Sequence, residues 1–313
     1  VSTETKQKGS LFIKSVIIVV MALALWMPTN LILEMVKERA NRQQEAVTDI
    51  SFKWAGKQSV APPVLMLPYY EAARFGGMKK MLYIFPDKCE FKSDVIPETR
   101  YRGIYEVPVY RSKVSMKGVF NPVVLTEKGI SPDNILWEDA KILFKVLDPV
   151  KGINEDIKLS MDQKIYVFRN QAEQAGSFHK AFETDLPFTF SDLDNPHQFQ
   201  MEFFLNGSTQ LMFNPLAREN SIQLKSSWSD PAFTGIKIPD TREVSDSGFV
   251  ANWKFINRSI PQVTDQASFD LNAMSIGVDF IIPVDNYDKT ERSVKYAILV
   301  IILTFAAFFL IET

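Results

Sequence analysis

The sequence is poor in the residues that build disulfides and metal centres. It contains a single cysteine, Cys89, and two histidines, His179 and His197. One cysteine excludes an intrachain disulfide and a C-x-x-C redox pair, and a lone thiol is typical of a buried core residue. Neither histidine has Cys or His neighbours at ligand spacing, so we expect no zinc site. Both lie in polar stretches, where we expect exposed side chains with no acid–base partner nearby in the sequence.

Motifs for nucleophilic and nucleotide chemistry are also missing. There is no G-x-S-x-G elbow, no Walker loop and no GxGxxG between a strand and a helix. Residues 245–248 predict a turn between strands. Residues 285–288 are acidic but lack the glycine and distal glutamate of a calcium loop. With a net charge of −2 there is no case for nucleic-acid binding. We expect no enzyme, no metal and no cofactor.

What the sequence does contain is a long apolar run near each end. Residues 11–27 (LFIKSVIIVVMALALWM) and 297–311 (AILVIILTFAAFFLI) flank roughly 260 residues of polar, strand-like sequence. This arrangement is typical of an extramembrane domain held by the lipid bilayer at both ends. The second run of fifteen residues makes about 22 Å of helix, against a hydrocarbon core of about 30 Å. We therefore expect a multi-pass protein with further helices that are absent from this chain.

The flanking charges predict the orientation. Lys6, Lys8 and Lys14 lie at the start of the first run with only Glu4 against them, so the N-terminus is expected in the cytoplasm and the central domain in the periplasm. An A-x-A sequence at 22–24 lies inside the apolar stretch, which favours an uncleaved anchor over a signal peptide.

After the first run, Pro28 interrupts the apolar stretch and residues 31–53 show helical spacing. Two interpretations stay open for this helix: packing on the following domain, or lying on the outer leaflet. The expected divisions are a cytoplasmic tail at 1–10, a transmembrane helix at 11–30, an amphipathic helix at 31–53, a periplasmic β-rich domain at 54–293, and the start of a second transmembrane helix at 294–313.

Between the apolar runs the pattern changes to the alternation of half-buried strands. Apolar and polar residues alternate in the stretches 201–205, 222–228, 249–255 and 276–282. Asn206-Gly207 predicts a tight hairpin turn leading to a second strand at 211–213. Pro108, within the Val- and Tyr-rich stretch 101–120, predicts an edge or a bulge. We expect a mainly β fold, a large antiparallel β-sandwich or curved-sheet extracytoplasmic domain flanked by transmembrane α-helices.

Motifs spread along the chain match a known family in their order. They are PVL and PY between 63 and 69, RGIYEVPVY at 102–110, GVF at 118–120, SW at 227–228, FTG at 233–235, GFVANW at 248–253 and GVDFIIPVDNYDKTERSVKYA at 277–297. On these motifs the chain resembles the bacterial inner membrane protein CreD family, also called cell envelope integrity protein CreD. It departs from the family at Pro62 and Ala217, where glycine is usual, and the family continues through more membrane helices.

The resemblance implies an inner membrane protein associated with envelope integrity and with responses to cell-wall stress and β-lactams. It supplies no catalytic residues to carry over. Within RGIYEVPVY, Gly103 and Pro108 are expected to set the backbone geometry. The candidate residues for contact with a partner are Arg102, Tyr105, Glu106 and Tyr110.

Three functions follow from these observations. The first is a non-enzymatic protein whose β domain contacts an unknown envelope protein or lipid partner. The second is handling of a lipid or hydrophobic ligand in an apolar groove that feeds a membrane bundle, which would require large apolar side chains facing an open groove. The third, a hydrolase acting on envelope polymer, would require convergent carboxylates or a serine with a base, and the sequence shows no such cluster.

Overall fold

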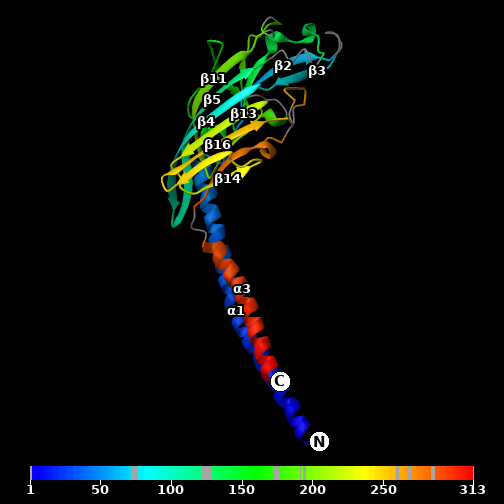
Figure 1. Cartoon of the computed structure of the whole chain (residues 1–313), viewed down its shortest axis with the longest axis vertical. Helices are drawn as coiled ribbons and strands as arrows, with labels where there is room; N and C mark the ends of the chain where they lie inside the picture. Colours follow the sequence, from blue (N-terminus) through cyan, green and yellow to red (C-terminus); the bar gives the residue numbers. More distant parts are fainter. Residues whose placement is uncertain are drawn as a thin grey trace. The chain divides into compact units, whose positions relative to one another are not determined.

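The structure is a computed structural model that describes residues 2–71, 77–121, 129–171, 176–190, 192, 195–258, 261–266, 270–282 and 286–312. The chain divides into two compact units, Val1–Thr48 with Ile282–Thr313, and Asp49–Ile281. The second unit is here called the β domain (Figure 1). The polar stretch at 172–176 is a candidate for a boundary within the β region by its composition, and all of it except residue 176 lies outside the described residues.

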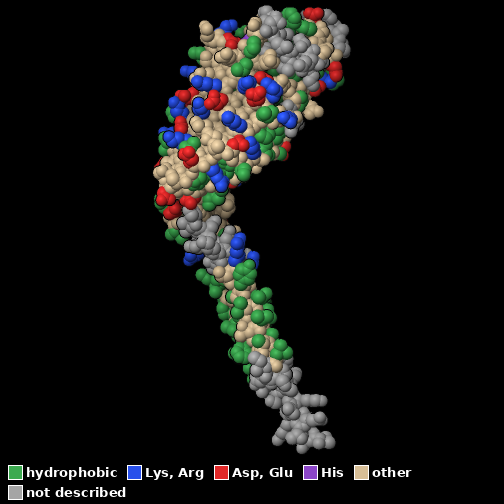
Figure 2. All heavy atoms as spheres, in the orientation of Figure 1, with side chains coloured by type: hydrophobic (Ala, Val, Ile, Leu, Met, Phe, Trp, Pro, Cys, Tyr) green, Lys and Arg blue, Asp and Glu red, His purple; other side chains and the backbone are tan. Residues whose placement is uncertain are grey.

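The first unit consists of helical segments. Helix α1 runs over Ser2–Lys53 with Pro28 inside it, and α3 runs over Asn286–Glu312. Pro28 therefore interrupts the apolar run without ending the helix, and membrane helices tolerate proline in this way. Within the described residues, one segment, Val16–Lys53, is long and apolar enough to cross a membrane, and none of its most apolar window is buried. In the described part of these helices, hydrophobic side chains are numerous on the visible surface (Figure 2).

The β domain is built from three sheets in its described residues. The largest has eight strands in the order β15 (Thr241–Ser245), β16 (Gly248–Ile256), β13 (Glu219–Ser226), β4 (Lys88–Arg102), β5 (Tyr105–Phe120), β11 (His197–Ser208), β7 (Ile157–Met161) and β8 (Lys164–Phe168). Five of these, from β11 through β5, β4 and β13 to β16, follow one another in Figure 1.

Two smaller sheets complete the domain. The four-stranded sheet has the order β1 (Gln58–Val60), β12 (Gln210–Phe213), β18 (Ile276–Phe280) and β14 (Pro231–Gly235). The six-stranded sheet has the order β17 (Val263–Thr264), β3 (Lys79–Ile84), β2 (Val64–Tyr70), β6 (Lys141–Phe144), β10 (Phe182–Asp185) and β9 (Asn170–Gln171). Short helical turns connect the strands: η2 (Pro132–Asn134), η3 (Trp137–Asp139), α2 (Pro149–Gly152), η4 (Gly176–Phe178) and η6 (Asn272–Met274).

The apolar core lies between the large sheet and the two smaller ones. Ring contacts join the sheets: Phe91 of β4 lies 5.3 Å from Phe213 of β12, and Phe203 of β11 lies 5.3 Å from Phe144 of β6, between ring centroids. Over residues 88–96 of β4 and 197–205 of β11, buried residues that face this core alternate with exposed ones that face away. The mainly β, sandwich-like class is therefore confirmed, although two pairings, β1–β12 and β4–β13, are parallel.

The hairpin predicted at Asn206-Gly207 is wrong. Both residues belong to β11, where they pair with Arg111 and Tyr110 of β5. The chain turns at Thr209, which has a φ of 60°, and then enters β12 in a different sheet. Gly207 serves instead to admit the side chain of Tyr110, which a Cβ at this position would meet.

Candidate functional site

The RGIYEVPVY motif forms the turn of the longest hairpin and the start of β5. Strands β4 and β5 pair up to Arg102 and Tyr105, and Gly103 in the turn has a φ of 61°, which favours glycine. Pairing between β5 and β11 extends to Val109 and stops before Pro108. Only β4 pairs with the strand there, which confirms the edge position predicted for the proline.

Tyr110 is a core residue of this hairpin and not a surface contact. Its side chain is 1% exposed and its hydroxyl donates to the carbonyl of Gln210 at 2.7 Å. Its ring lies 5.1 Å from that of Phe280, between centroids. Burial raises the pKa of the phenol well above its ordinary value. The residue therefore joins the large sheet to the four-stranded one.

The remaining candidate contact residues lie at the hairpin's surface. Tyr105 is half-buried, and Arg102 and Glu106 are exposed. Arg102 forms an ion pair with Asp49, which also pairs with Lys53 at 2.9 Å. Beside it, the Arg100 guanidinium lies 5.3 Å from the centre of the Trp54 ring. The structure thus uses Arg102 to fasten the hairpin to the segment at 49–54.

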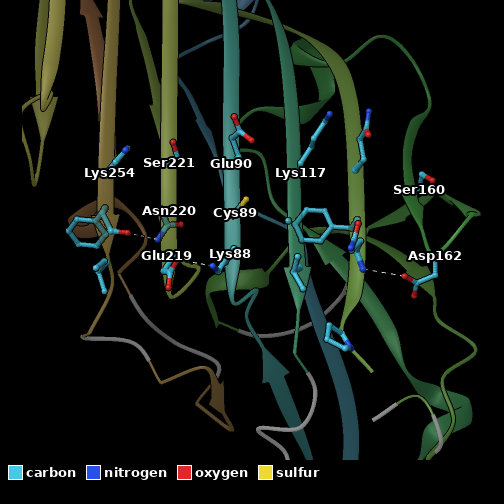
Figure 3. Close-up of a pocket in the computed structure, with 18 of the residues that line it drawn as sticks. Lys88, Cys89, Glu90, Lys117, Ser160, Asp162, Glu219, Asn220, Ser221 and Lys254 are labelled. Atoms are coloured by element: carbon cyan, nitrogen blue, oxygen red, sulfur yellow. Dashed lines mark hydrogen bonds and ion pairs between the residues drawn. The ribbon is translucent and has the colours of Figure 1, made fainter. Parts of the chain in front are cut away.

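A groove of about 1100 Å³ crosses the outer face of the large sheet. Its walls come from β16, β13, β4, β5, β11 and β7, near the ends of these strands that lie far from the β4–β5 turn. Figure 3 shows Lys254, Ser221, Glu90, Lys117 and Ser160 in a line across the strands. Charged side chains also gather on the visible face of the β domain in Figure 2.

Ion pairs order one end of the groove. Glu219 pairs with Lys88 at 3.3 Å and with Arg218 at 3.2 Å. Arg218 in turn donates through Nε to Asp87 at 2.6 Å. The hydrogen bonds from Arg218, with a further one from Gln262, lower the pKa of the Asp87 carboxyl. Of these residues, Lys88 and Glu219 line the groove itself.

His197 is buried at the opposite end, so the expectation of an exposed side chain is wrong. No acid–base partner lies near it in the sequence, but the fold supplies a distant one. Its Nδ1 lies 2.5 Å from Oδ2 of Asp162, and its Nε2 donates to the carbonyl of Asp192 at 2.7 Å. Asp162 and Gln163 form the β7–β8 turn, both with positive φ. The partner is 35 residues away in sequence and is brought close by the pairing of β7 with β11. With both ring nitrogens engaged, the pair acts as a structural clamp on this turn.

Among the described residues, no group of His, Cys, Asp and Glu side chains could hold a metal ion. Cys89 is buried beneath the groove, and its burial raises the pKa of the thiol. Its position in β4 is that of a core residue. Residues 245–248 join β15 to β16, as the predicted turn requires, while the acidic stretch at 285–288 lies partly outside the described residues.

Sequence reasoning did not find the groove. The signal that was available is the alternation in residues 88–95, KCEFKSDV, which places four charged side chains on one face of a strand. The groove forms because β4 pairs with β13, with Lys88 opposite Glu219, so that the polar faces of the two strands adjoin. No local pattern specifies such a long-range parallel pairing.

Comparisons with known proteins give a relative in sequence and a weak structural alignment. The chain is 28% identical to the inner membrane protein CreD of Escherichia coli (strain K12) over 323 aligned positions, which cover 98% of this chain and 70% of that protein. A solved structure, the M1 zinc metallopeptidase from Deinococcus radiodurans, aligns with 6% identity and a TM-score of 0.28. That alignment covers 63% of this chain and 42% of the peptidase, and so low a score does not establish a common fold.

The family comparison confirms the resemblance drawn from the motifs. The model of the family described as inner membrane protein CreD matches residues 10–313, which include α3, the whole β domain and nearly all of α1. The chain therefore belongs to the inner membrane protein CreD family.

Proposed function

We propose that this protein is a non-enzymatic inner membrane protein whose β domain lies in the periplasm and binds an envelope component through the polar groove. In this role it acts in envelope integrity and in the response to envelope and β-lactam stress. Family membership supports the membrane location and the envelope role. Lys6, Lys8 and Lys14 support a cytoplasmic N-terminus, with α1 and α3 as anchors and further helices following in a multi-pass protein.

The observation that carries the binding role is the groove itself. Its line of polar side chains crosses six strands of one sheet, on the face that carries no second layer of described strands. The backbone groups of these strands are already paired within the sheet, so the side chains are free to meet a ligand. A large concave surface with convergent polar groups is typical of a binding site.

The chemistry of the groove does not favour the lipid-handling alternative. That function requires large apolar side chains facing an open groove, whereas the large aromatic and aliphatic residues of the β domain lie mainly in the core between the sheets. The groove has a mixed lining, in which lysine, glutamate, glutamine and serine side chains lie beside Val119, Phe255 and Ile256. Burying an acyl chain against such groups would leave them without water or a partner.

The side chains at the edge of the groove support the non-enzymatic part of the proposal. The nearest acid–base pair to the groove is His197 with Asp162, and a backbone carbonyl occupies the second nitrogen of that histidine. A histidine that acts as general base needs a free ring nitrogen within reach of the substrate proton, and His197 has none.

Photo-crosslinking in cells tests the proposal. A photoreactive phenylalanine derivative replaces Gln200 or Ser221 in the groove, and Ile238, which is 72% exposed and outside the groove, is the matched control. We expect crosslinked envelope species from the two groove positions and none from Ile238. Equal crosslinking at all three positions, or none at the groove, would contradict the binding role.

A further inference from the structure

The groove side chains form a register row, in which one residue from each strand stands beside its neighbour. The strand pairings connect Lys254 to Ser221, Ser221 to Glu90, Glu90 to Lys117, Lys117 to Gln200 and Gln200 to Ser160. Figure 3 shows the labelled members of this row pointing from the same face of the sheet. A ligand that follows the row would lie across the strands and not along them.

The row contains two lysines and one glutamate, and the carboxylates that line the groove already have partners. Glu90 pairs with Lys92 at 2.9 Å, Glu219 pairs with Lys88, and Asp162 is engaged by His197. Within the described residues, the ammonium groups of Lys117 and Lys254 have no ion pair, and both residues are exposed. Three strand spacings separate them, which is about 14 Å. The row therefore presents two exposed lysines whose backbone positions are set by the sheet.

Between these cations lie Ser221 and Glu90, whose charge is paired with Lys92. Neutral groups line the rest of the groove: Gln198, Gln200 and Ser160 offer amides and hydroxyls, and Val119, Phe255 and Ile256 offer apolar surface. Amides and hydroxyls match the hydroxyl groups of sugars, and apolar side chains match the C–H faces of sugar rings. A peptide would gain little here, because the strand backbones below the groove are already paired and cannot receive an added strand.

We infer that the groove binds an extended acidic glycan, a hydroxyl-rich chain whose carboxylates meet Lys117 and Lys254. This inference rests on the proposed function and specifies the chemistry of its ligand. Lys117 and Lys254 supply the charge recognition. Ser221 hydrogen-bonds a sugar hydroxyl between the two lysines, and Gln200 hydrogen-bonds one beyond Lys117. The chain runs across β16, β13, β4 and β5 toward β11 and β7.

Calorimetric titration of the full chain in detergent tests the inference. The probes are alginate oligosaccharides, which carry carboxylates, neutral cello-oligosaccharides, and poly-glutamate. We expect alginate to bind most tightly, with an affinity that falls as salt rises. Lys117→Gln and Lys254→Gln should each weaken binding about threefold, and the double variant about tenfold. Lys225→Gln, an exposed lysine of β13 outside the groove, is the control and should leave the affinity unchanged.

Several outcomes overturn the inference. Equal affinity for the neutral oligosaccharide removes the role of charge, and tighter binding of poly-glutamate makes the partner an acidic peptide. Failure of alginate to bind, while Gln200 still forms crosslinks in cells, rejects the glycan and leaves the proposed function standing. Absence of groove crosslinks overturns the proposed function whatever the titration gives.

Discussion

Tyr110 and Gly207 face each other across β5 and β11, and the phenol of the first occupies the space where a side chain of the second would lie. A Cβ on Gly207 would also come within 2.8 Å of Cγ of Gln58, a fully buried residue. The tyrosine cannot move aside without losing its hydrogen bond to the carbonyl of Gln210. The glycine is therefore required by the packing between the sheets.

Gly207→Ala should destabilise the β domain by about 1–3 kcal/mol, the usual range for an overpacked core. Thermal unfolding of the detergent-solubilised chain, followed by tryptophan fluorescence, measures the change. Gly56→Ala is the matched control, because its Cβ would lie 3.6 Å from the nearest atom and its backbone is unstrained. Equal melting temperatures for the two variants would contradict the packing role of Gly207.

Gly207 also shows where a local pattern misleads. Asn-Gly is the strongest short hairpin signal, yet here the asparagine and the glycine continue strand β11. The glycine is needed for packing against Tyr110 and not for a turn. Where alternation alone determines a strand, the prediction holds: residues 249–255 form most of β16, with Phe249, Ala251 and Trp253 buried. Periodicity shows which face of a strand is buried, but it does not show which distant residues pack against that face.

His197 and Asp162 should stabilise the protein together. His197→Ala removes the donor to the carbonyl of Asp192 and to the carboxylate of Asp162, which is 44% exposed and keeps its hydrogen bond from the backbone of Gln198. The expected loss is therefore about 1 kcal/mol. A double-mutant cycle with Asp162→Ala should give a coupling energy of about 1 kcal/mol or more. His179→Ala, at an exposed histidine, is the control for the stability change. Additive effects of the two substitutions would show that the two side chains do not act as a pair.

The groove shows why most of the candidate site could not be predicted from the sequence. Its residues belong to six strands, and the row that joins them depends on the exact register of every pairing. A slip of one residue in any strand would turn that strand's polar side chains toward the core. The sequence did single out the motif RGIYEVPVY, and the structure gives three of its residues structural roles. Gly103 forms the turn, Arg102 pairs with Asp49, and Tyr110 packs in the core.

Arg102 and Glu106 can be separated by their effects on stability. Arg102→Ala removes the ion pair with Asp49, and because the arginine side chain is 52% exposed, the expected loss is at most about 1 kcal/mol. Glu106→Ala should leave the melting temperature unchanged, and it serves as the control from the same motif. If Arg102→Ala left the stability unchanged while abolishing an in-cell crosslink at the hairpin, a partner-contact role would replace the structural one.

The carboxyl of Asp87 should make stability depend on pH. Arg218 and Gln262 donate hydrogen bonds to its ionised form and lower its pKa below the ordinary 3.8 of an aspartate. A lowered folded-state pKa means that the stabilisation is complete well above pH 3.8 and is lost as the pH falls through the folded-state value. Asp87→Asn should therefore lower the free energy of unfolding by about 1 kcal/mol at neutral pH, since the arginine is partly exposed and screened by solvent. The deficit relative to the unsubstituted chain should shrink toward zero in acid, whereas Asp246→Asn, in the exposed β15–β16 turn, should show no deficit at either pH. Urea unfolding at neutral and acid pH measures both differences, and a deficit for Asp87→Asn that stays constant with pH would mean that Asp87 stabilises the fold by its shape and not by its charge.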